Sequence, residues 1–334
     1  MAERPLVSVV IPFYNAENTI QETLQSVLNQ TYPNIEIILV NDGSTDGAVK
    51  IIEHLRHSHE TITVITQDNA GVAAARNTGI AASKGEYIAP IDADDLWHPM
   101  RVEMHVDALE QASPSVAVAY SPAYILDEKG YIIHKPKKFE LSGNVFSEQL
   151  DVNFVGNGSG LTIRKDALTK IGGYSPMLRE KGAQGCEDYM VQMMLAFHYH
   201  YVAVPYYLIG YRVYEGNMSS DEIKMLKSRF LVYDFLQSEY ELDEEQVAQG
   251  KKSALFFHIL KLCKKHQMIK SWRELKPIIK QIYSPAHFVC IIWKTILYKL
   301  LKKIIENLKT VFLPKSKEDE KLGFSDIAKQ PPTT

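Results

Sequence analysis

Residues 87–95 read YIAPIDADD, a short apolar run that ends in three carboxylates. The apolar part is typical of a strand buried on both faces, as in parallel sheets that helices cover on either side. In an extended backbone alternate side chains share a face, so Asp92 and Asp94 would point one way and Asp95 another. Two carboxylates on one side suit Mg²⁺ or Mn²⁺. An acidic loop that caps the next helix, beginning near Pro99, is the simpler interpretation of this motif taken alone.

The surrounding sequence repeats the same alternation of strand and helix. Predicted strands are each followed by a predicted helix, in the pairs 7–11 and 17–29, 35–40 and 48–55, 61–66 and 72–83, 87–91 and 100–111. Such repeats predict a mostly parallel α/β sheet flanked by helices, in which ligands bind beyond the carboxyl ends of the strands. A polar segment follows every predicted strand, at 12–15, 41–44, 67–69 and 92–95. The sequence therefore predicts one site formed by four loops.

The rest of the chain differs in pattern. Strands between 116 and 214 are expected to be short and hairpin-like, and residues 221–285 to form a C-terminal helical extension. We thus expect an α/β domain that carries the predicted site at 1–220, the extension at 221–285, a basic amphipathic helix at 286–312 and a disordered tail at 313–334.

Composition excludes several classes of protein. Cys186, Cys263 and Cys290 are far apart and form no CxxC pair, so neither a disulfide framework nor a zinc site is expected, and a reducing cytosol is. The formal net charge of −3 gives no indication of a nucleic-acid partner. The apolar run near the N-terminus is too short for a signal peptide or a membrane span.

Residues 42–47, DGSTDG, together with Glu53 nearly match a calcium-binding loop. We reject that interpretation because residues 35–40 predict a buried strand, whereas an EF-hand needs a helix before its loop. A helix cap and a base-binding carboxylate remain, and both can hold if Asp46 is the cap and Asp42 the ligand.

Glu187 and Asp188 begin a predicted helix in the segment QGCEDY, residues 184–189. Acidic residues in a first turn are commonly partners of the helix dipole. A carboxylate in this position can instead face a cleft and act as a general base. Periodicity alone does not separate these interpretations.

Four segments in this order resemble the family 2 inverting glycosyltransferases, which have the GT-A fold. They are VSVVIPFYN at 7–15, VNDGSTD at 40–46, NAGVAAARNTG at 69–79 and DADD at 92–95. The resemblance covers roughly residues 5–217 and implies a Rossmann-like sheet. In this chain Tyr214 stands in the segment where relatives often have a histidine, which puts a metal or phosphate contact from that position in doubt.

The resemblance also implies roles for individual residues. Pro12, Tyr14 and Asp42 would hold the nucleoside base, with Asn69 and Arg76 as supports of the nucleotide pocket. Asp92 and Asp94 would approach the ribose, the diphosphate and a bound Mn²⁺ or Mg²⁺. Asp188 of the Glu187–Asp188 pair would be the catalytic base.

We therefore expect a metal-dependent, inverting glycosyltransferase that moves a sugar from a nucleotide-sugar, expected to be a UDP-sugar, to a hydroxyl of a saccharide or lipid-linked acceptor. Cell-surface polysaccharide or glycolipid synthesis is the expected context. A metal-dependent nucleotidyl or phosphoryl transferase ranks lower because the chain has no GxxxxGK[ST] segment. A non-catalytic nucleotide-sugar-binding protein is disfavoured because all the expected carboxylates are present.

Residues 288–312 carry apolar residues at helical spacing, interrupted by lysines. The lysines exclude a membrane span. The helix can pack on protein, or it can lie in the membrane interface with its lysines toward anionic headgroups. We prefer the second interpretation, which places the protein in the cytoplasm, at the inner face of the cytoplasmic membrane.

Overall fold

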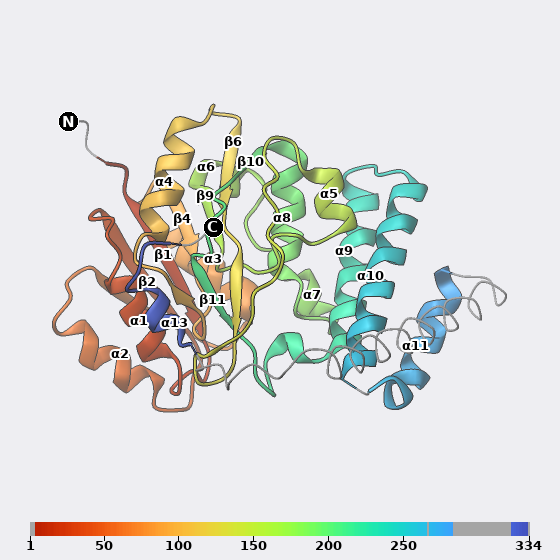
Figure 1. The fold of residues 1–334 in the computed structure, drawn as a ribbon, viewed down its shortest axis with the longest axis horizontal. Helices are drawn as coiled ribbons and strands as arrows, with labels where there is room; N and C mark the ends of the chain where they lie inside the picture. The colour runs from red at the N-terminus through yellow and green to blue at the C-terminus, as the bar shows by residue number, and fades with distance from the viewer. Residues whose placement is uncertain (1–3, 266, 283–321, 333–334) are drawn as a thin grey trace, which may run out of the picture. The chain divides into compact units, whose positions relative to one another are not determined.

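The computed structural model describes residues 4–265, 267–282 and 322–332 of the 334-residue chain (Figure 1). The chain divides into two compact units, of which unit 1 comprises Met1–Ser220 and Leu322–Thr334 and unit 2 comprises Asp221–Lys321. The predicted amphipathic helix at 286–312 lies outside the described residues.

Unit 1 is built on a seven-stranded sheet, counted over the described residues, in the order β10-β6-β9-β4-β1-β2-β3. Its strands are β1 (Val7–Phe13), β2 (Ile35–Asp42), β3 (Ile62–Gln67), β4 (Tyr87–Pro90), β6 (Val116–Tyr120), β9 (Leu161–Arg164) and β10 (His200–Ala203). β1 pairs in parallel with β2 and β4, β2 with β3, and β6 with β10. Only β9 among these runs antiparallel to its neighbours. The prediction of a mostly parallel sheet is confirmed.

Helices cover both faces of this sheet. The helices of unit 1 that precede β10 are α1 (Ile20–Leu28), α2 (Ala48–Arg56), α3 (Val72–Ala82), α4 (Arg101–Gln111), α5 (Phe146–Asp151), α6 (Lys165–Lys170), α7 (Met177–Glu180) and α8 (Glu187–His198). The strand-then-helix order of the first four units follows the sequence pattern, because each helix returns the chain to the start of the next parallel strand.

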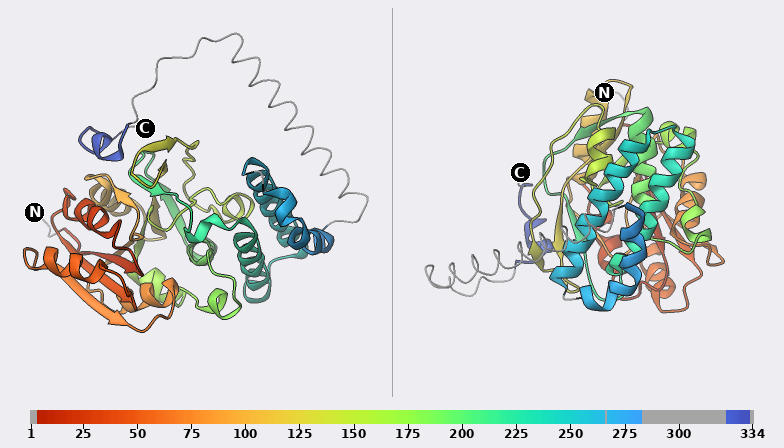
Figure 2. Two further views of the ribbon diagram at one scale, coloured as in Figure 1. Left: turned by 90° about the horizontal axis from the view of Figure 1, so that it is seen from below. Right: turned by 90° about the vertical axis from the view of Figure 1, so that its right-hand side faces the viewer.

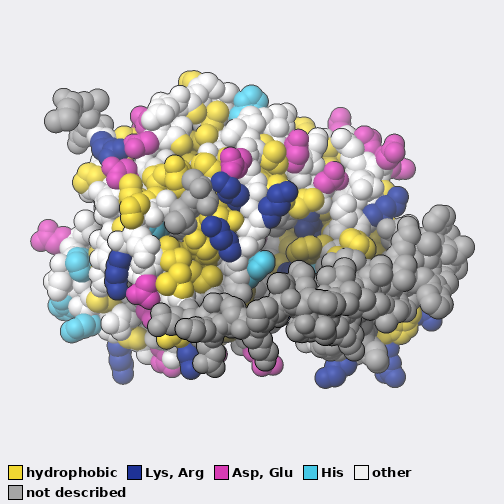
Figure 3. All heavy atoms as spheres, in the orientation of Figure 1, with side chains coloured by type: hydrophobic (Ala, Val, Ile, Leu, Met, Phe, Trp, Pro, Cys, Tyr) yellow, Lys and Arg dark blue, Asp and Glu magenta, His cyan; other side chains and the backbone are white. Residues whose placement is uncertain are grey.

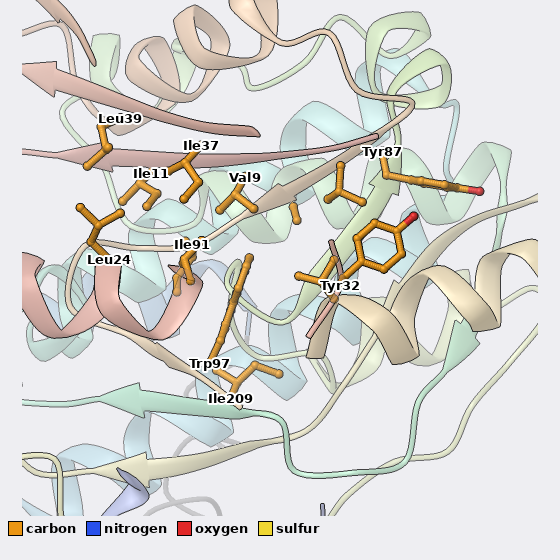
Figure 4. Packing of buried hydrophobic residues seen from close by; sticks show 14 of the residues in the cluster. Val9, Ile11, Leu24, Tyr32, Ile37, Leu39, Tyr87, Ile91, Trp97 and Ile209 are labelled. Atoms are coloured by element: carbon orange, nitrogen blue, oxygen red, sulfur yellow. The ribbon is translucent and has the colours of Figure 1, made fainter. Parts of the chain in front are cut away.

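The alternation of side chains along β1 and β2 produces a core on each face. One face carries Val9, Ile11, Ile37 and Leu39, which point toward Leu24 of α1 (Figure 4). The opposite face packs against α3, where Ala75 lies in a buried cluster with Ile38 and Val40.

Gly79 of α3 allows a close approach of helix and sheet. A Cβ at Gly79 would lie 2.5 Å from Cγ1 of Val10 and 3.3 Å from Cγ2 of Val40. Ala75, one turn earlier on α3, packs in a buried apolar cluster with Val40. Small residues on α3 therefore bring its N-terminus close to the strand ends that form the site.

A second, four-stranded sheet lies in the order β5-β11-β7-β8. Its strands are β5 (Leu96–Trp97), β7 (Ala123–Leu126), β8 (Ile132–His134) and β11 (Ile209–Arg212). β7 and β8 form a hairpin in the region where the sequence predicts short, hairpin-like strands, with the amide of Gly130 donating to the carbonyl of Asp127 at 3.1 Å.

The prediction of a disordered tail from 313 to 334 is wrong for residues 322–332. This segment contains helix α13 (Phe324–Ile327), and Phe324 and Ile327 are buried in an apolar cluster with Leu96 and Tyr124. Residues 313–334 are mostly polar, which predicts disorder, but Phe324 and Ile327 pack on a surface that forms only in the folded chain.

Unit 2 is helical. It contains α9 (Glu222–Glu239), α10 (Glu244–Lys264) and α11 (Met268–Ile282), which pack against one another (Figure 2). Asp221 and Asp243 cap α9 and α10 through hydrogen bonds from backbone amides to their carboxylates. No helix in the described ranges is long and apolar enough to cross a membrane.

Candidate active site

Asp42 organises the loops at the carboxyl ends of β2 and β3. Its side chain is 3% exposed, and its carboxylate accepts hydrogen bonds from Nε2 of Gln67 and from the amides of Ala70 and Gly71, each at 2.8 Å. The carboxylate thus satisfies amides at the start of α3, where the helix dipole also favours negative charge.

Asn69 joins this loop to a distant one. Its Nδ2 donates to the carbonyl of Asp42 at 2.9 Å, and its Oδ1 accepts from Nη2 of Arg179 at 3.0 Å. Arg179 belongs to α7, which precedes the Glu187–Asp188 pair. The side chain of Asn69 therefore joins two loops at the edge of the sheet.

The loops after β1 and β2 are joined by Asn15. Its amide donates to Oγ of Ser44 at 3.0 Å, and its Oδ1 accepts from the amide of Thr45 at 2.8 Å. Beside it Tyr14 is 53% exposed, as a ring available for stacking would be. Pro12, in contrast, is buried within β1 and pairs with Val40, so its side chain contributes to the sheet.

Asp46 does what the sequence predicts for a helix cap. Its Oδ1 accepts from the amide of Ala48, the first residue of α2, at 3.1 Å. Its Oδ2 accepts from the amide of Glu17 at 2.8 Å. No part of this loop has the helix before it that an EF-hand requires, since β2 precedes it.

Asp92 and Asp94 follow β4 in a turn, so the prediction that they lie in extended backbone is wrong. β4 ends at Pro90, residues 93 and 94 form the turn, and the amide of Asp95 donates to the carbonyl of Asp92 at 3.1 Å. The shared face of an extended strand is therefore not what brings Asp92 and Asp94 together. The turn does so, and their charges interact.

Arg76 of α3 connects Asp92 to the Glu187–Asp188 loop. Its Nη2 lies 2.5 Å from Oδ1 of Asp92, and its guanidinium stacks 5.0 Å from the ring centroid of Tyr174. A Cβ at Gly158 would lie 3.4 Å from both Nη2 of Arg76 and Cβ of Asp188. Gly158 is therefore the spacer that lets Arg76 and Asp188 approach each other.

Asp188 lies in the first turn of α8 and is half-buried. Burial raises the pKa of its carboxyl to about 6, although the nearby Arg76 lowers it. Glu187 differs, because it is only 4% exposed and its Oε2 accepts from the amide of Gly185 at 2.8 Å. Of the two carboxylates, Glu187 stabilises the loop and Asp188 lies beside Arg76.

Asp94 is held from the side of β11. Its Oδ2 accepts from the hydroxyl of Tyr214 at 3.1 Å, and its carbonyl accepts from Nε of Arg212 at 2.8 Å. Burial, followed by the negative charge of Asp92, raises the pKa of Asp94 to about 6. Tyr214, at the position where a metal or phosphate contact was in doubt, thus contacts Asp94.

Asp95 points inward. It is fully buried, and its carboxylate accepts from Oγ of Ser159 at 2.5 Å and from the amide of Arg212 at 3.0 Å. Trp97 is also a core residue, with its Nε1 donating to the carbonyl of Ser159 at 2.9 Å. Both residues therefore support the turn from behind.

Two oxygen ligands, and no complete protein cage, are available for a cation. Over the described ranges, no three His, Cys, Asp or Glu side chains converge as a metal-binding group. Asp92 and Asp94 offer carboxylates whose mutual repulsion a cation would relieve. Mg²⁺ and Mn²⁺ are commonly held by one or two carboxylates with substrate phosphates completing the shell, so this donor set fits such a metal.

Sequence reasoning missed Arg212 and Ser159. Arg212 is 2% exposed, and besides its bonds to Asp94 and Asp95 it pairs with Glu22 at 2.7 Å. Ser159 also accepts from the amide of Asp92 at 3.0 Å. A charged residue at the end of the apolar strand β11, and a serine in a glycine-rich loop, were the available signals.

The family model for "Glycosyl transferase family 2" matches residues 8–172, which include the Asp42, Arg76 and Asp92 positions. Uncharacterized glycosyltransferase RT0329 of Rickettsia typhi is 28% identical over 309 residues, or 89% of this chain and 92% of that protein. The putative teichuronic acid biosynthesis glycosyltransferase TuaG of Bacillus subtilis is 39% identical over 111 residues, or 33% of this chain and 44% of TuaG. Residues 8–172 of this chain thus match glycosyltransferase family 2.

Solved structures show the same fold. S. aureus TarS in complex with UDP-GlcNAc has a TM-score of 0.60 and 19% identity, covering 76% of this chain and 72% of that one. Mannosyltransferase PcManGT from Pyrobaculum calidifontis, in complex with GDP-Man and Mn²⁺, has a TM-score of 0.55 and 18% identity. The match covers 92% of this chain and 88% of that one. The fold of unit 1 is the GT-A fold.

Proposed function

We propose that this glycosyltransferase moves a sugar from a UDP-sugar to an acceptor hydroxyl with inversion at the sugar C1. The observation that carries the proposal is the position of Arg76 between Asp92 and Asp188. The guanidinium of Arg76 thus lies near both the carboxylate proposed for the diphosphate side and the candidate base.

The donor nucleoside would bind at the loops after β1, β2 and β3. Tyr14 is exposed for stacking on the base, while Asp42 and Asn69 shape the floor of the loop. Pro12 would act only through its place in β1. UDP is proposed as the nucleotide because the TarS structure, which shares this fold, contains UDP-GlcNAc.

Asp92 and Asp94 would hold a divalent cation, Mn²⁺ or Mg²⁺, against the diphosphate. A cation bound there would supply Lewis-acid stabilisation of the negative charge that develops on the leaving diphosphate. Mn²⁺ in the PcManGT structure supports this choice. Arg76 would fix Oδ1 of Asp92, which leaves Oδ2 for the ligand.

Asp188 would accept the proton of the acceptor hydroxyl as that oxygen attacks C1 from the face opposite the diphosphate. Its raised pKa, about 6, makes it a stronger base than an exposed aspartate while leaving it mostly ionised at neutral pH. One displacement gives inversion, and no covalent sugar–enzyme bond is needed.

The acceptor would be a saccharide or a lipid-linked saccharide of a cell-surface polysaccharide or glycolipid. The similarity to TuaG supports a polysaccharide context. A lipid-linked acceptor would place the protein in the cytoplasm at the inner face of the membrane, with residues 288–312 as the proposed peripheral contact. That segment lies outside the described residues, and its role rests on its sequence alone.

The test is release of free UDP by the full-length protein from a panel of UDP-sugars with Mn²⁺, with and without membrane extract as a source of acceptor. We expect release that depends on both Mn²⁺ and extract, and Asp188→Asn serves as the inactive control. Binding of UDP without release from any sugar would identify a binding protein. Release of pyrophosphate in place of UDP would identify a nucleotidyl transferase.

A further inference from the structure

The C-terminal segment, residues 322–332, returns to unit 1 and extends its second sheet. The amide of Ile132 donates to the carbonyl of Leu322 at 3.0 Å, and the amide of Phe324 donates to the carbonyl of Gly130 at 3.1 Å. Tyr131 and Gly323 form an antiparallel bridge. The segment therefore covers the β7–β8 hairpin at the edge that would otherwise expose unpaired backbone groups.

Phe324 is the apolar anchor of this segment. It is 2% exposed and lies in a cluster with Leu96, Leu126 and Tyr207. Hydrophobic side chains gather on the face of unit 1 where α13 and β11 lie (Figure 3). Phe324 thus connects strands β5 and β7, which come from separate parts of the chain.

Gly210 of β11 is the position that makes room for this ring. A Cβ at Gly210 would lie 3.0 Å from Cγ of Phe324 and 2.6 Å from Cδ1 of Leu126. Gly210 also pairs with Leu96 of β5. The ring of Phe324 therefore packs directly over the point where β11 meets β5.

A second contact comes from the end of the segment. Nε2 of His98 lies 2.9 Å from the carbonyl of Gln330, and Nδ1 of His98 accepts from the amide of Met100 at 3.2 Å. These partners assign the neutral tautomer with its proton on Nε2, because the carbonyl of Gln330 can only accept. His98 follows β5 directly, so this bond fixes the exit of β5.

The two strands held in this way carry the Asp94–Asp95 turn. Asp94 and Asp95 immediately precede β5, and Arg212 is the last residue of β11. Arg212 donates to the carbonyl of Asp94 and to the carboxylate of Asp95 at 2.8 and 3.0 Å. A shift of β11 against β5 would therefore move the turn with it.

We propose that residues 322–332 are a positioning element of the transferase site, which holds β5 and β11 so that Asp94 keeps its place near Asp92. This inference rests on the proposed function. Phe324 and Gln330 touch neither donor nor acceptor and act through Leu96, Gly210 and His98. The site is thus completed by a segment that follows unit 2 in the chain.

The test compares full-length Phe324→Ala with Phe146→Ala as a matched control. Phe146 is also buried, at 9% exposed, and it packs edge-on against Phe197 at the end of α8 away from Asp188. Both changes remove one buried ring and should lower the Tm by similar amounts. Phe324→Leu keeps the cluster filled and serves as the conservative variant.

We expect Phe324→Ala to weaken Mn²⁺-dependent UDP binding by about ten- to a hundredfold, because a small displacement of a site residue is costly. It should raise the KM for the donor more than it lowers kcat. Phe146→Ala and Phe324→Leu should retain affinity within about threefold. Native-state amide exchange at residues 94–98 and 209–213 should be faster in Phe324→Ala than in Phe146→Ala.

Equal affinities and equal exchange in Phe324→Ala and Phe146→Ala would overturn the positioning role. If Phe324→Ala does not fold, the smaller change Ile327→Ala at the same cluster takes its place, with the same expected order. Absence of UDP binding by the wild-type protein would instead refute the proposed function, and the exchange comparison would still decide whether the segment holds the turn.

Discussion

The guanidinium of Arg76 is bonded to the carboxylate of Asp92, with 2.5 Å between Nη2 and Oδ1. Arg76 is almost fully buried, while the side chain of Asp92 is 32% exposed. The buried guanidinium of Arg76 therefore binds an aspartate at the edge of the sheet and leaves that aspartate accessible to solvent. Because Arg76 also interacts with Asp188, one residue orients one side of the proposed site and sets the charge on the other.

Replacement of Arg76 by methionine should damage both stability and binding. Removing one partner of a buried ion pair costs about 3 to 5 kcal/mol, and we expect the lower end because Asp92 is partly in solvent. Arg76→Lys keeps the charge and should be milder. Urea unfolding together with Mn²⁺-dependent UDP titration measures both effects, and a methionine variant with wild-type stability and affinity would contradict this role.

Asp92→Ala and Asp94→Ala should each reduce Mn²⁺-dependent UDP affinity by at least about tenfold, which corresponds to about 1.4 kcal/mol. The fold should persist in Asp94→Ala, because this side chain lies on the turn and not in the core. Asp92→Ala should also lose stability, because it leaves the buried Arg76 without its ion-pair partner. Calorimetric titration of UDP with Mn²⁺ measures the effect, and a circular dichroism melt is the control. Unchanged affinity in both variants would remove these residues from the proposed metal site.

Asp188→Asn should bind donor normally but transfer sugar roughly 10² to 10⁴ times more slowly, the usual contribution of a general base. Glu187→Gln is the matched control. Its carboxylate is buried and bonded to the amide of Gly185, so its replacement should affect the loop more than the chemistry. Initial rates at saturating donor measure the difference, and the reverse order of the two effects would identify Glu187 as the base.

The rate should fall as the pH drops through about 6, since burial raises the pKa of Asp188 to about 6 and only its ionised form accepts a proton. Below that pKa the ionised fraction, and with it kcat, falls about tenfold per pH unit. Saturating donor and Mn²⁺ separate this effect from protonation of Asp94. A kcat that stays constant down to about pH 5 would show that another group is the base.

Gly85→Ala should destabilise unit 1 without touching the site. A Cβ at Gly85 would lie 2.6 Å from the carbonyl oxygen of Leu6 and 2.7 Å from the amide nitrogen of Ser8. Relief of such a clash requires movement of backbone, for which a cost of about 1 to 3 kcal/mol is typical. Lys84→Ala at the exposed neighbouring position should change stability by no more than about 0.5 kcal/mol. Equal unfolding free energies of the two variants in urea would contradict the predicted clash.

The sequence by itself determined the sheet and the rim. The apolar strands β1, β2 and β4 alternate with helices along the chain. This local pattern is enough to predict parallel pairing and to place Asp42, Asp92 and Asp94 at the carboxyl ends of strands. The carboxylates of Glu187 and Asp188 could be found in the same way, as the first turn of a helix. Their separate tasks could not, since both have the same chemistry and differ only in what surrounds them.

Only the tertiary structure decided the contacts that cross the chain. Arg212 meets Asp95 across 117 positions, and His98 meets Gln330 across 232. Such contacts leave no local period, because they depend on how separate elements pack and on which buried polar groups then need a partner. For the same reason the sequence predicts a polar tail at residues 322–332, because the contacts of Phe324 with Leu96 and Gly210 form only in the folded chain. The energy that orders the segment comes from burial on a surface that exists only after unit 1 has folded.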